Sequence, residues 1–85
     1  MASLRTLRKI VKQIAVRDAE LFTRDFPGKV CRTEKSDWDA VAWVDEVPVL
    51  QREHGATDAQ IDGLWPVYAA ALTAETQRLA ALANA

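Results

Sequence analysis

The sequence predicts an all-α fold, a small bundle of three to four helices within a single domain that covers residues 1–85. Two observations support this prediction. Apolar residues recur at helical spacing near both ends of the chain, and capping or breaking signals bound each candidate segment. The predicted helices span about 3–25, 37–47, 48–54 and 58–82, and the last one is bent near Pro66. The single cysteine, Cys31, excludes an intramolecular disulfide, so the fold depends on its apolar core.

The first helix is predicted from seven apolar side chains that fall within an arc of about 120° when successive residues are placed 100° apart. They are Leu4, Leu7, Ile10, Val11, Ile14, Leu21 and Phe22. The stretch FPGK then ends the helix. Pro27 restrains the residue before it, and Gly28 accepts backbone angles that other residues avoid.

The middle of the chain begins with a predicted N-cap at Ser36, supported by Asp39 three residues later. Pro48 is expected to break this segment into helix 37–47 and a short helix 48–54 that Gly55 closes. The stretch VAWVDEVPVL is rich in β-branched residues, so an extended conformation for 41–50 remains an alternative.

The last helix opens with Thr57 as N-cap and Gln60 three residues later, the pattern of a capping box. Its apolar face comprises Ile61, Leu64, Trp65, Tyr68, Leu72, Leu79 and Leu82. Gly63 and Pro66 lie off that face, so they predict a bend and not a broken core.

Charge is distributed unevenly along the chain. Residues 1–17 carry five cations and no acid, whereas the whole chain has a net charge of −1. Four of these cations share an arc of about 100° beside the apolar stripe, and we call them the basic face: Arg5, Arg8, Lys9 and Lys12. Such a cluster predicts a surface for an acidic protein or for a nucleic-acid backbone.

Two carboxylates fall inside the apolar arcs, Asp18 in the first helix and Glu75 in the last. A buried carboxylate is costly unless it is paired. Arg17 and Arg24 lie at the edge of the first apolar stripe, so we expect one of them to pair with Glu75 and fix the docking of the terminal helices.

No catalytic function is predicted. The only histidine, His54, precedes Gly55, where histidine commonly helps to close a helix. A lone cysteine is usually an apolar filler, and carboxylates at helix starts usually serve as caps. The acids concerned are Asp37, Asp39, Asp45 and Glu46. One histidine and one cysteine without close ligand spacing predict no metal site, and nothing indicates a cofactor or a small-molecule substrate.

The second segment predicts a protein-binding surface. Trp43, Val47 and Leu50 form one stripe, while Trp38 and Val41 point to nearly the opposite side. A helix that is apolar on both sides either lies within a core or offers one side to a partner. The predicted partner-binding set, an aromatic anchor with a polar rim, is Trp38, Val41, Asp37 and Asp45. The alternative is that Trp38 and Trp65 are ordinary core aromatics.

We therefore expect a small cytoplasmic interaction module, an adaptor, inhibitor or assembly subunit that acts as a homodimer or within a hetero-complex. The Ala-, Val-, Asp- and Arg-rich composition is typical of proteins from GC-rich bacteria or their phages. The alternative is a nucleic-acid-binding regulator that uses the basic face. Membrane binding is disfavoured, because the apolar stripe of the first helix is needed for the core and no apolar run reaches a membrane-spanning length.

Overall fold

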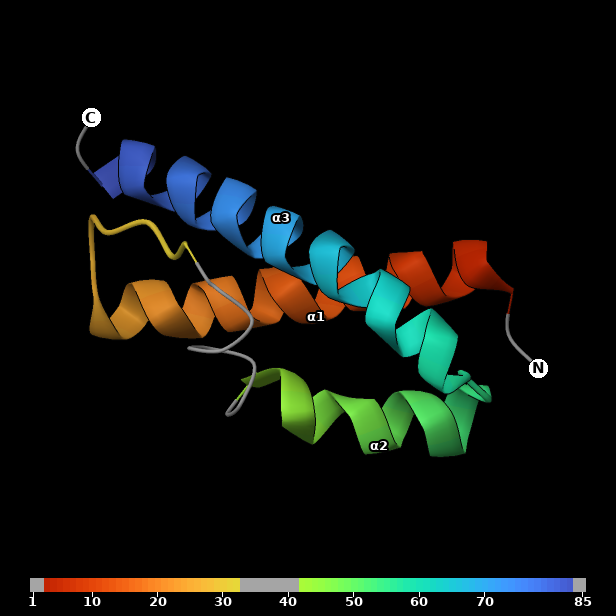
Figure 1. Cartoon of the computed structure of the whole chain (residues 1–85). Coiled ribbons are helices and arrows are strands. Elements are labelled where there is room, and N and C mark those ends of the chain that lie inside the picture. The colour runs from red at the N-terminus through yellow and green to blue at the C-terminus, as the bar shows by residue number, and fades with distance from the viewer. Residues whose placement is uncertain (1–2, 33–41, 84–85) are drawn as a thin grey trace.

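Three helices make up the fold in a computed structural model, which describes residues 3–32 and 42–83. They are α1 (Leu4–Asp25), α2 (Ala42–His54) and α3 (Asp58–Ala83), and Figure 1 shows their arrangement. The all-α prediction is confirmed, and the extended alternative is excluded for residues 42–50. Helix α1 packs on α3 along much of its length and touches α2 only lightly.

Helix α1 begins and ends at local signals. The Ser3 hydroxyl oxygen accepts a hydrogen bond from the backbone N–H of Thr6 at 3.2 Å, which satisfies one of the free donors of the first turn. At the other end the N–H of Phe26 donates to the carbonyl of Phe22 at 2.8 Å. Gly28 then adopts a φ of 79°, so the predicted role of the FPGK stretch is confirmed.

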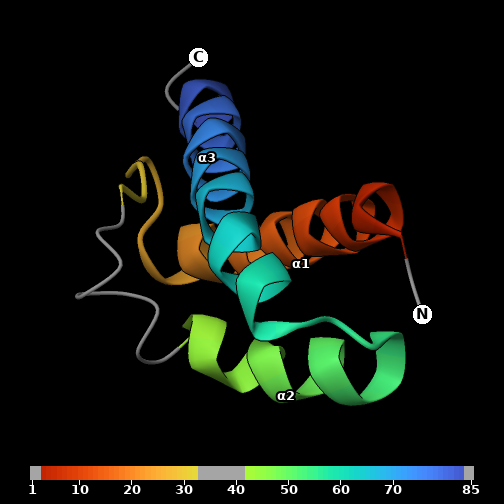
Figure 2. The ribbon, with the colours of Figure 1, turned by 45° about the vertical axis from the view of Figure 1, so that its right-hand side comes forward.

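The core lies between α1 and α3. Its fully buried residues on α1 are Leu7, Val11, Ala15 and Ala19, and α3 contributes Leu64, Tyr68, Leu72 and Thr76. Within each set the residues are four positions apart, so each helix presents a row of side chains with this spacing. Two helices whose rows of this kind interdigitate cross obliquely. Figure 2 shows this oblique crossing.

The crossing explains why two residues of the predicted apolar stripe, Leu4 and Leu21, are exposed. A row of spacing four turns by about 40° at each step around an α-helix. The buried row on α1 therefore drifts away from a stripe parallel to the helix axis. The small side chains of Ala15 and Ala19 occupy the contact instead.

Helix α2 runs without interruption through Pro48, so the predicted division into helices 37–47 and 48–54 is wrong for the described residues. Pro48 lies on the exposed side of α2, where water can replace the hydrogen bond that proline cannot donate. Leu50 is fully buried, and Val47 packs beside it against the core. The predicted cap at Ser36 and Asp39 lies outside the described residues.

The predicted end of α2 and start of α3 are confirmed. Gly55 has a φ of 68°, and its N–H donates to the carbonyl of Gln51 at 3.2 Å. The Thr57 N–H donates to Gln60 Oε1 at 2.9 Å, and the Gln60 N–H donates to Thr57 Oγ1 at 3.1 Å. These reciprocal bonds form the capping box.

Helix α3 continues through Pro66, and its first turns run at a different angle from the rest (Figure 1). The predicted core face is correct through Leu79, which is partly buried, but Leu82 is 63% exposed because it lies beyond the last buried position, Ala80. No helix in the described part of the chain is both long and apolar enough to span a membrane.

The segment after α1 is fastened to α3 through the backbone of Cys31. Its N–H donates to Thr76 Oγ1 at 2.9 Å, and its carbonyl accepts from the Thr73 hydroxyl at 2.8 Å. The Thr76 hydroxyl in turn donates within α3, where the carbonyl of Leu72 lies 3.0 Å away. Both backbone polar groups of a buried residue are thereby satisfied.

Candidate functional site

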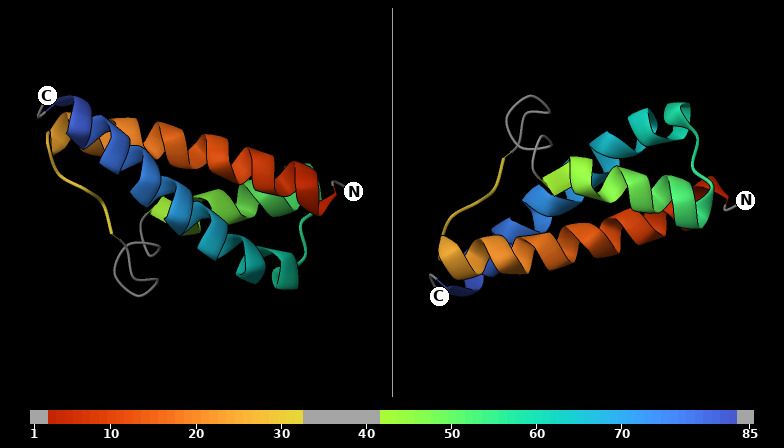
Figure 3. Two further views of the ribbon diagram at one scale, coloured as in Figure 1. Left: turned by 90° about the horizontal axis from the view of Figure 1, so that it is seen from above. Right: turned by 90° about the horizontal axis from the view of Figure 1, so that it is seen from below.

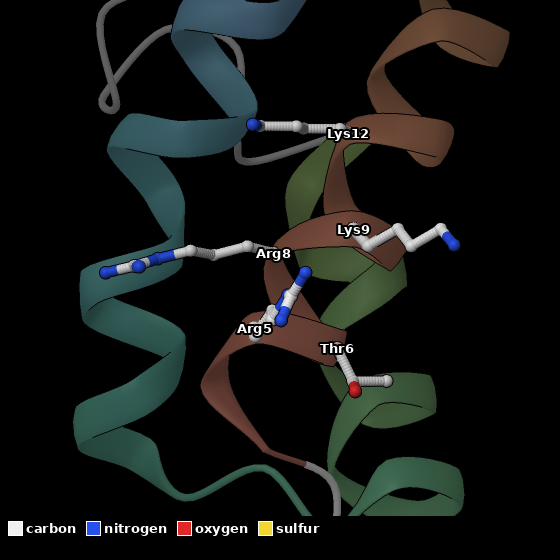
Figure 4. A pocket seen from close by; sticks show the side chains of 5 residues that line it. All are labelled: Arg5, Thr6, Arg8, Lys9 and Lys12. Atoms are coloured by element: carbon white, nitrogen blue, oxygen red, sulfur yellow. The ribbon is translucent and has the colours of Figure 1, made fainter.

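The basic face occupies the first three turns of α1. Its four cations and Thr6 line a surface hollow of about 460 Å³, seen from close by in Figure 4. Arg8 and Lys12 extend toward the α3 side of α1, whereas Lys9 extends toward the opposite side and Arg5 lies between them. The positive charge is therefore spread over a broad face and is not focused on a single point.

Among the residues that the structure describes, these four cations form no ion pair with an acid. The ion pairs among residues 3–32 and 42–83 join Arg17 to Asp18 and Glu46, and Arg78 to Glu75. None of these pairs involves the basic face. An exposed cluster of like charge without neutralising carboxylates attracts anionic partners over a distance of about one Debye length, roughly 8 Å at physiological salt.

Arg5, the first cation of the basic face, occupies an electrostatically unfavourable position on its helix. The N-terminal end of an α-helix carries a partial positive charge, so acids are stabilising there and cations are not. The first turn of α1 contains Arg5 and no acid. A charge that opposes the helix dipole lowers stability. Local losses of stability of this kind are typical of functional sites, where the charge is needed at that position.

A second hollow, of about 330 Å³, adjoins the first along α1. Lys9 and Lys12 line both hollows, and Gln13 and Val16 complete the second. The aliphatic stems of the lysines cover the helix surface while their ammonium groups reach water. Sequence reasoning missed Val16, although its angular position lies among those of the four cations.

Arg17 is not part of the basic face, because it joins helices. Its Nη2 lies 2.5 Å from Glu46 Oε1 on α2 and 3.7 Å from Asp18 Oδ1. The hydroxyl of the buried Tyr68 on α3 donates to Asp18 Oδ2 at 2.7 Å. Asp18, the carboxylate inside the apolar arc of α1, is thus bound by one group from its own helix and one from α3.

The predicted pairing of Arg17 or Arg24 with Glu75 is not the one that the structure makes. Glu75 instead binds Arg78 one turn along α3, with Arg78 Nη2 at 2.5 Å from Glu75 Oε1. Arg24 is exposed at the last turn of α1. The sequence pattern identified the carboxylate that needs a partner, but a neighbour on the same helix supplies it.

Replacing Glu75 by glutamine is expected to cause a small loss of thermal stability at neutral pH that disappears in acid. The hydrogen bond from Arg78, aided by its charge, lowers the pKa of Glu75 in the folded protein. Its stabilising contribution is therefore present above the usual glutamate pKa of about 4.3 and is lost as the pH falls through the folded value. Melting temperatures of both proteins between about pH 2 and 7 test this.

The control is Glu53→Gln, which removes an exposed carboxylate on α2. It makes the same substitution outside the Arg78 pair, so its effect on the melting temperature gives the reference for the loss of one surface carboxylate. A Glu75→Gln difference that persists unchanged at the lowest pH would contradict the assignment to the Arg78 pair.

The predicted partner-binding set around Trp38 stays a prediction. Asp37, Trp38 and Val41 lie outside the described residues, as does the side chain of Asp45. Trp65 is partly buried against the core with its ring centroid 5.8 Å from that of Tyr68, so for Trp65 the core interpretation is supported.

The structure describes Cys31 and His54, the cysteine and the histidine considered for catalysis or metal binding. Cys31 is buried, and burial raises the pKa of its thiol, so the reactive thiolate is disfavoured. His54 ends α2 and is half-buried. Within 3–32 and 42–83, no group of three or more His, Cys, Asp or Glu side chains could hold a metal ion.

The basic face, with the hollow beside it, is thus the candidate functional site. Comparisons of the chain with protein-family models, with curated proteins and with solved structures gave no match.

Proposed function

We propose that the protein acts by binding, and that the basic face of α1 is the docking surface for an acidic protein. The observation that carries this proposal is the set of four exposed cations without a carboxylate partner among the described residues. Arg5 lies in the first turn of α1, where its charge adds to the positive end of the helix dipole. A partner carboxylate would relieve both the mutual repulsion of the cations and the conflict of Arg5 with the dipole.

Two features favour a protein over nucleic acid. The hollow at Val16 continues the basic face with a surface of aliphatic carbon, which an apolar side chain of a protein can fill and a phosphate backbone cannot. The start of α1 also lies at the same end of the molecule as the end of α2 and the start of α3 (Figure 3). These two segments carry exposed carboxylates, Glu53, Asp58 and Asp62, which repel a long polyanion.

A duplex DNA experiment separates the two classes of partner. Labelled DNA of mixed sequence is mixed with the protein at about 50 and 200 mM salt, and binding is followed by fluorescence anisotropy. Four phosphate contacts would weaken binding roughly 150-fold over that range. We expect no saturable binding at either salt concentration, and a salt-dependent loss of that size would overturn the proposal in favour of nucleic acid.

Arg5→Glu is expected to make the protein more stable and yet unable to bind its partner. An acid in the first turn of α1 interacts favourably with the helix dipole and removes one of four mutually repelling cations. The expected gain is about 1 kcal/mol, or a rise of about 4–8 °C in melting temperature. The measurement is capture of proteins from a nuclease-treated lysate of the expressing cells. Proteins that the wild type captures should not be captured by the variant.

Lys29→Glu is the matched control, since it makes the same change in charge at an exposed position outside α1. It should leave the melting temperature and the captured proteins unchanged. Equal capture by wild type and Arg5→Glu would reject the basic face as the docking surface. A loss of stability in Arg5→Glu would show that the arginine serves the fold.

A further inference from the structure

We infer that the partner presents an acidic amphipathic α-helix, and that this helix lies antiparallel along α1. The inference rests on the proposed function and adds the shape, the sequence order and the orientation of the partner. The stripe that the partner helix would contact runs through both hollows: Arg5, Lys9, Lys12 and Val16.

The stripe suits a helix as the partner, because a second helix repeats its side chains along its axis with the same pitch as α1. The residues of the stripe are four, three and four positions apart, the repeat with which one helix faces another along a common seam. The stripe covers three turns of α1, about 16 Å at 1.5 Å per residue. An extended strand rises about 3.3 Å per residue and presents every second side chain, so its repeat of about 6.6 Å falls out of step with the helical pitch of about 5.4 Å.

The chemistry of the stripe determines what the partner carries. Three cations occupy its first two turns, and Val16, which is 38% exposed, ends it beside the carbon-lined hollow. A complementary helix needs carboxylates opposite Arg5, Lys9 and Lys12 and an apolar side chain opposite Val16. Charge pairing would set the register, and burial of the apolar side chain would add affinity.

Helix dipoles select the antiparallel orientation. The partner's negative C-terminal end then lies beside the positive N-terminal end of α1. The carboxylates of the partner fall near its own C-terminus, where they oppose its dipole as Arg5 opposes that of α1. Docking relieves both conflicts at once. Read from its N-terminus, the partner helix therefore carries the apolar residue first and the carboxylates afterwards.

Two synthetic peptides of identical composition test this order. The forward peptide has leucine followed by glutamates 4, 7 and 11 positions later, on an alanine- and glutamine-based helical background. The reversed peptide has the three glutamates first and leucine last, with the same spacing. The reversed peptide is the better isolated helix because its acids lie near the N-terminus. Tighter binding of the forward peptide therefore cannot arise from greater helicity, which circular dichroism measures for both.

We expect the forward peptide to bind the full-length protein about tenfold more tightly than the reversed peptide at about 50 mM salt. The Val16→Ser variant should bind the forward peptide about tenfold more weakly than the wild type does. Val49→Ser is its matched control, because Val49 is 41% exposed, belongs to α2 and lines neither hollow. It should bind the forward peptide as the wild type does. Isothermal titration calorimetry gives all of these affinities.

The failures of the two proposals are distinguishable. Equal affinities for the forward and reversed peptides, or equal effects of Val16→Ser and Val49→Ser, would overturn the antiparallel helix. If Arg5→Glu still abolished capture of the cellular partner in that case, the proposed function would stand. Failure of both peptides to bind would likewise reject the helical partner alone, whereas capture that is insensitive to Arg5→Glu would reject both.

Discussion

Leu72→Ala is expected to lower the free energy of unfolding by about 3 kcal/mol, because it removes a fully buried side chain from the centre of the contact between α1 and α3. The total stability of a chain of this length is of the order of 4–13 kcal/mol. The loss is therefore a large share of the whole, and the melting temperature should fall by at least about 12 °C. Urea unfolding followed by circular dichroism measures the change.

Leu82→Ala is the matched control for this prediction. It makes the same substitution on the same helix at a side chain that is 63% exposed, so the expected loss is below about 0.5 kcal/mol. Similar losses for the two variants would mean that the contact between α1 and α3 is not the principal core. That result would also mean that packing on α3 does not hold the basic face of α1 in position.

Helix ends could be predicted from the sequence because their chemistry is local. The Thr57–Gln60 capping box needs only two residues three positions apart. Gly28 and Gly55 close their helices through backbone angles that glycine adopts without strain. The basic face is local in the same sense, since one regular helix is enough to bring cations at 5, 8, 9 and 12 together.

Contacts between helices could not be predicted in the same way. A stripe drawn along the axis of α1 includes Leu21 and omits Ala15, but the oblique crossing of α3 reverses their burial. The partner of Arg17 is Glu46, on a helix whose position depends on tertiary packing. The break predicted at Pro48 is wrong for a similar reason. Pro48 lies on the exposed side of α2, where its missing hydrogen bond costs little, and the sequence does not reveal which side is exposed.

The fastening of Cys31 to α3 also follows from tertiary structure, and it makes Thr76 more than an ordinary core residue. Thr76 is fully buried, and its hydroxyl is the acceptor for the N–H of Cys31 at 2.9 Å. Without that hydroxyl a buried backbone donor would have no acceptor in this conformation. The cost of such a group is about 1–3 kcal/mol.

Thr76→Val is therefore expected to reduce stability by about 1–3 kcal/mol, although valine preserves the shape of the side chain and creates no cavity. In the wild type the Cys31 thiol is buried, and burial raises its pKa. The substitution should also release the segment around Cys31, so that the thiol reacts faster with a thiol reagent under native conditions. Thr76→Ser keeps the hydroxyl and loses a buried methyl group. It should cost about 1 kcal/mol but leave the labelling slow. Equally slow labelling of the valine variant would show that the bond from the Thr73 hydroxyl to the Cys31 carbonyl is enough to hold the segment on α3.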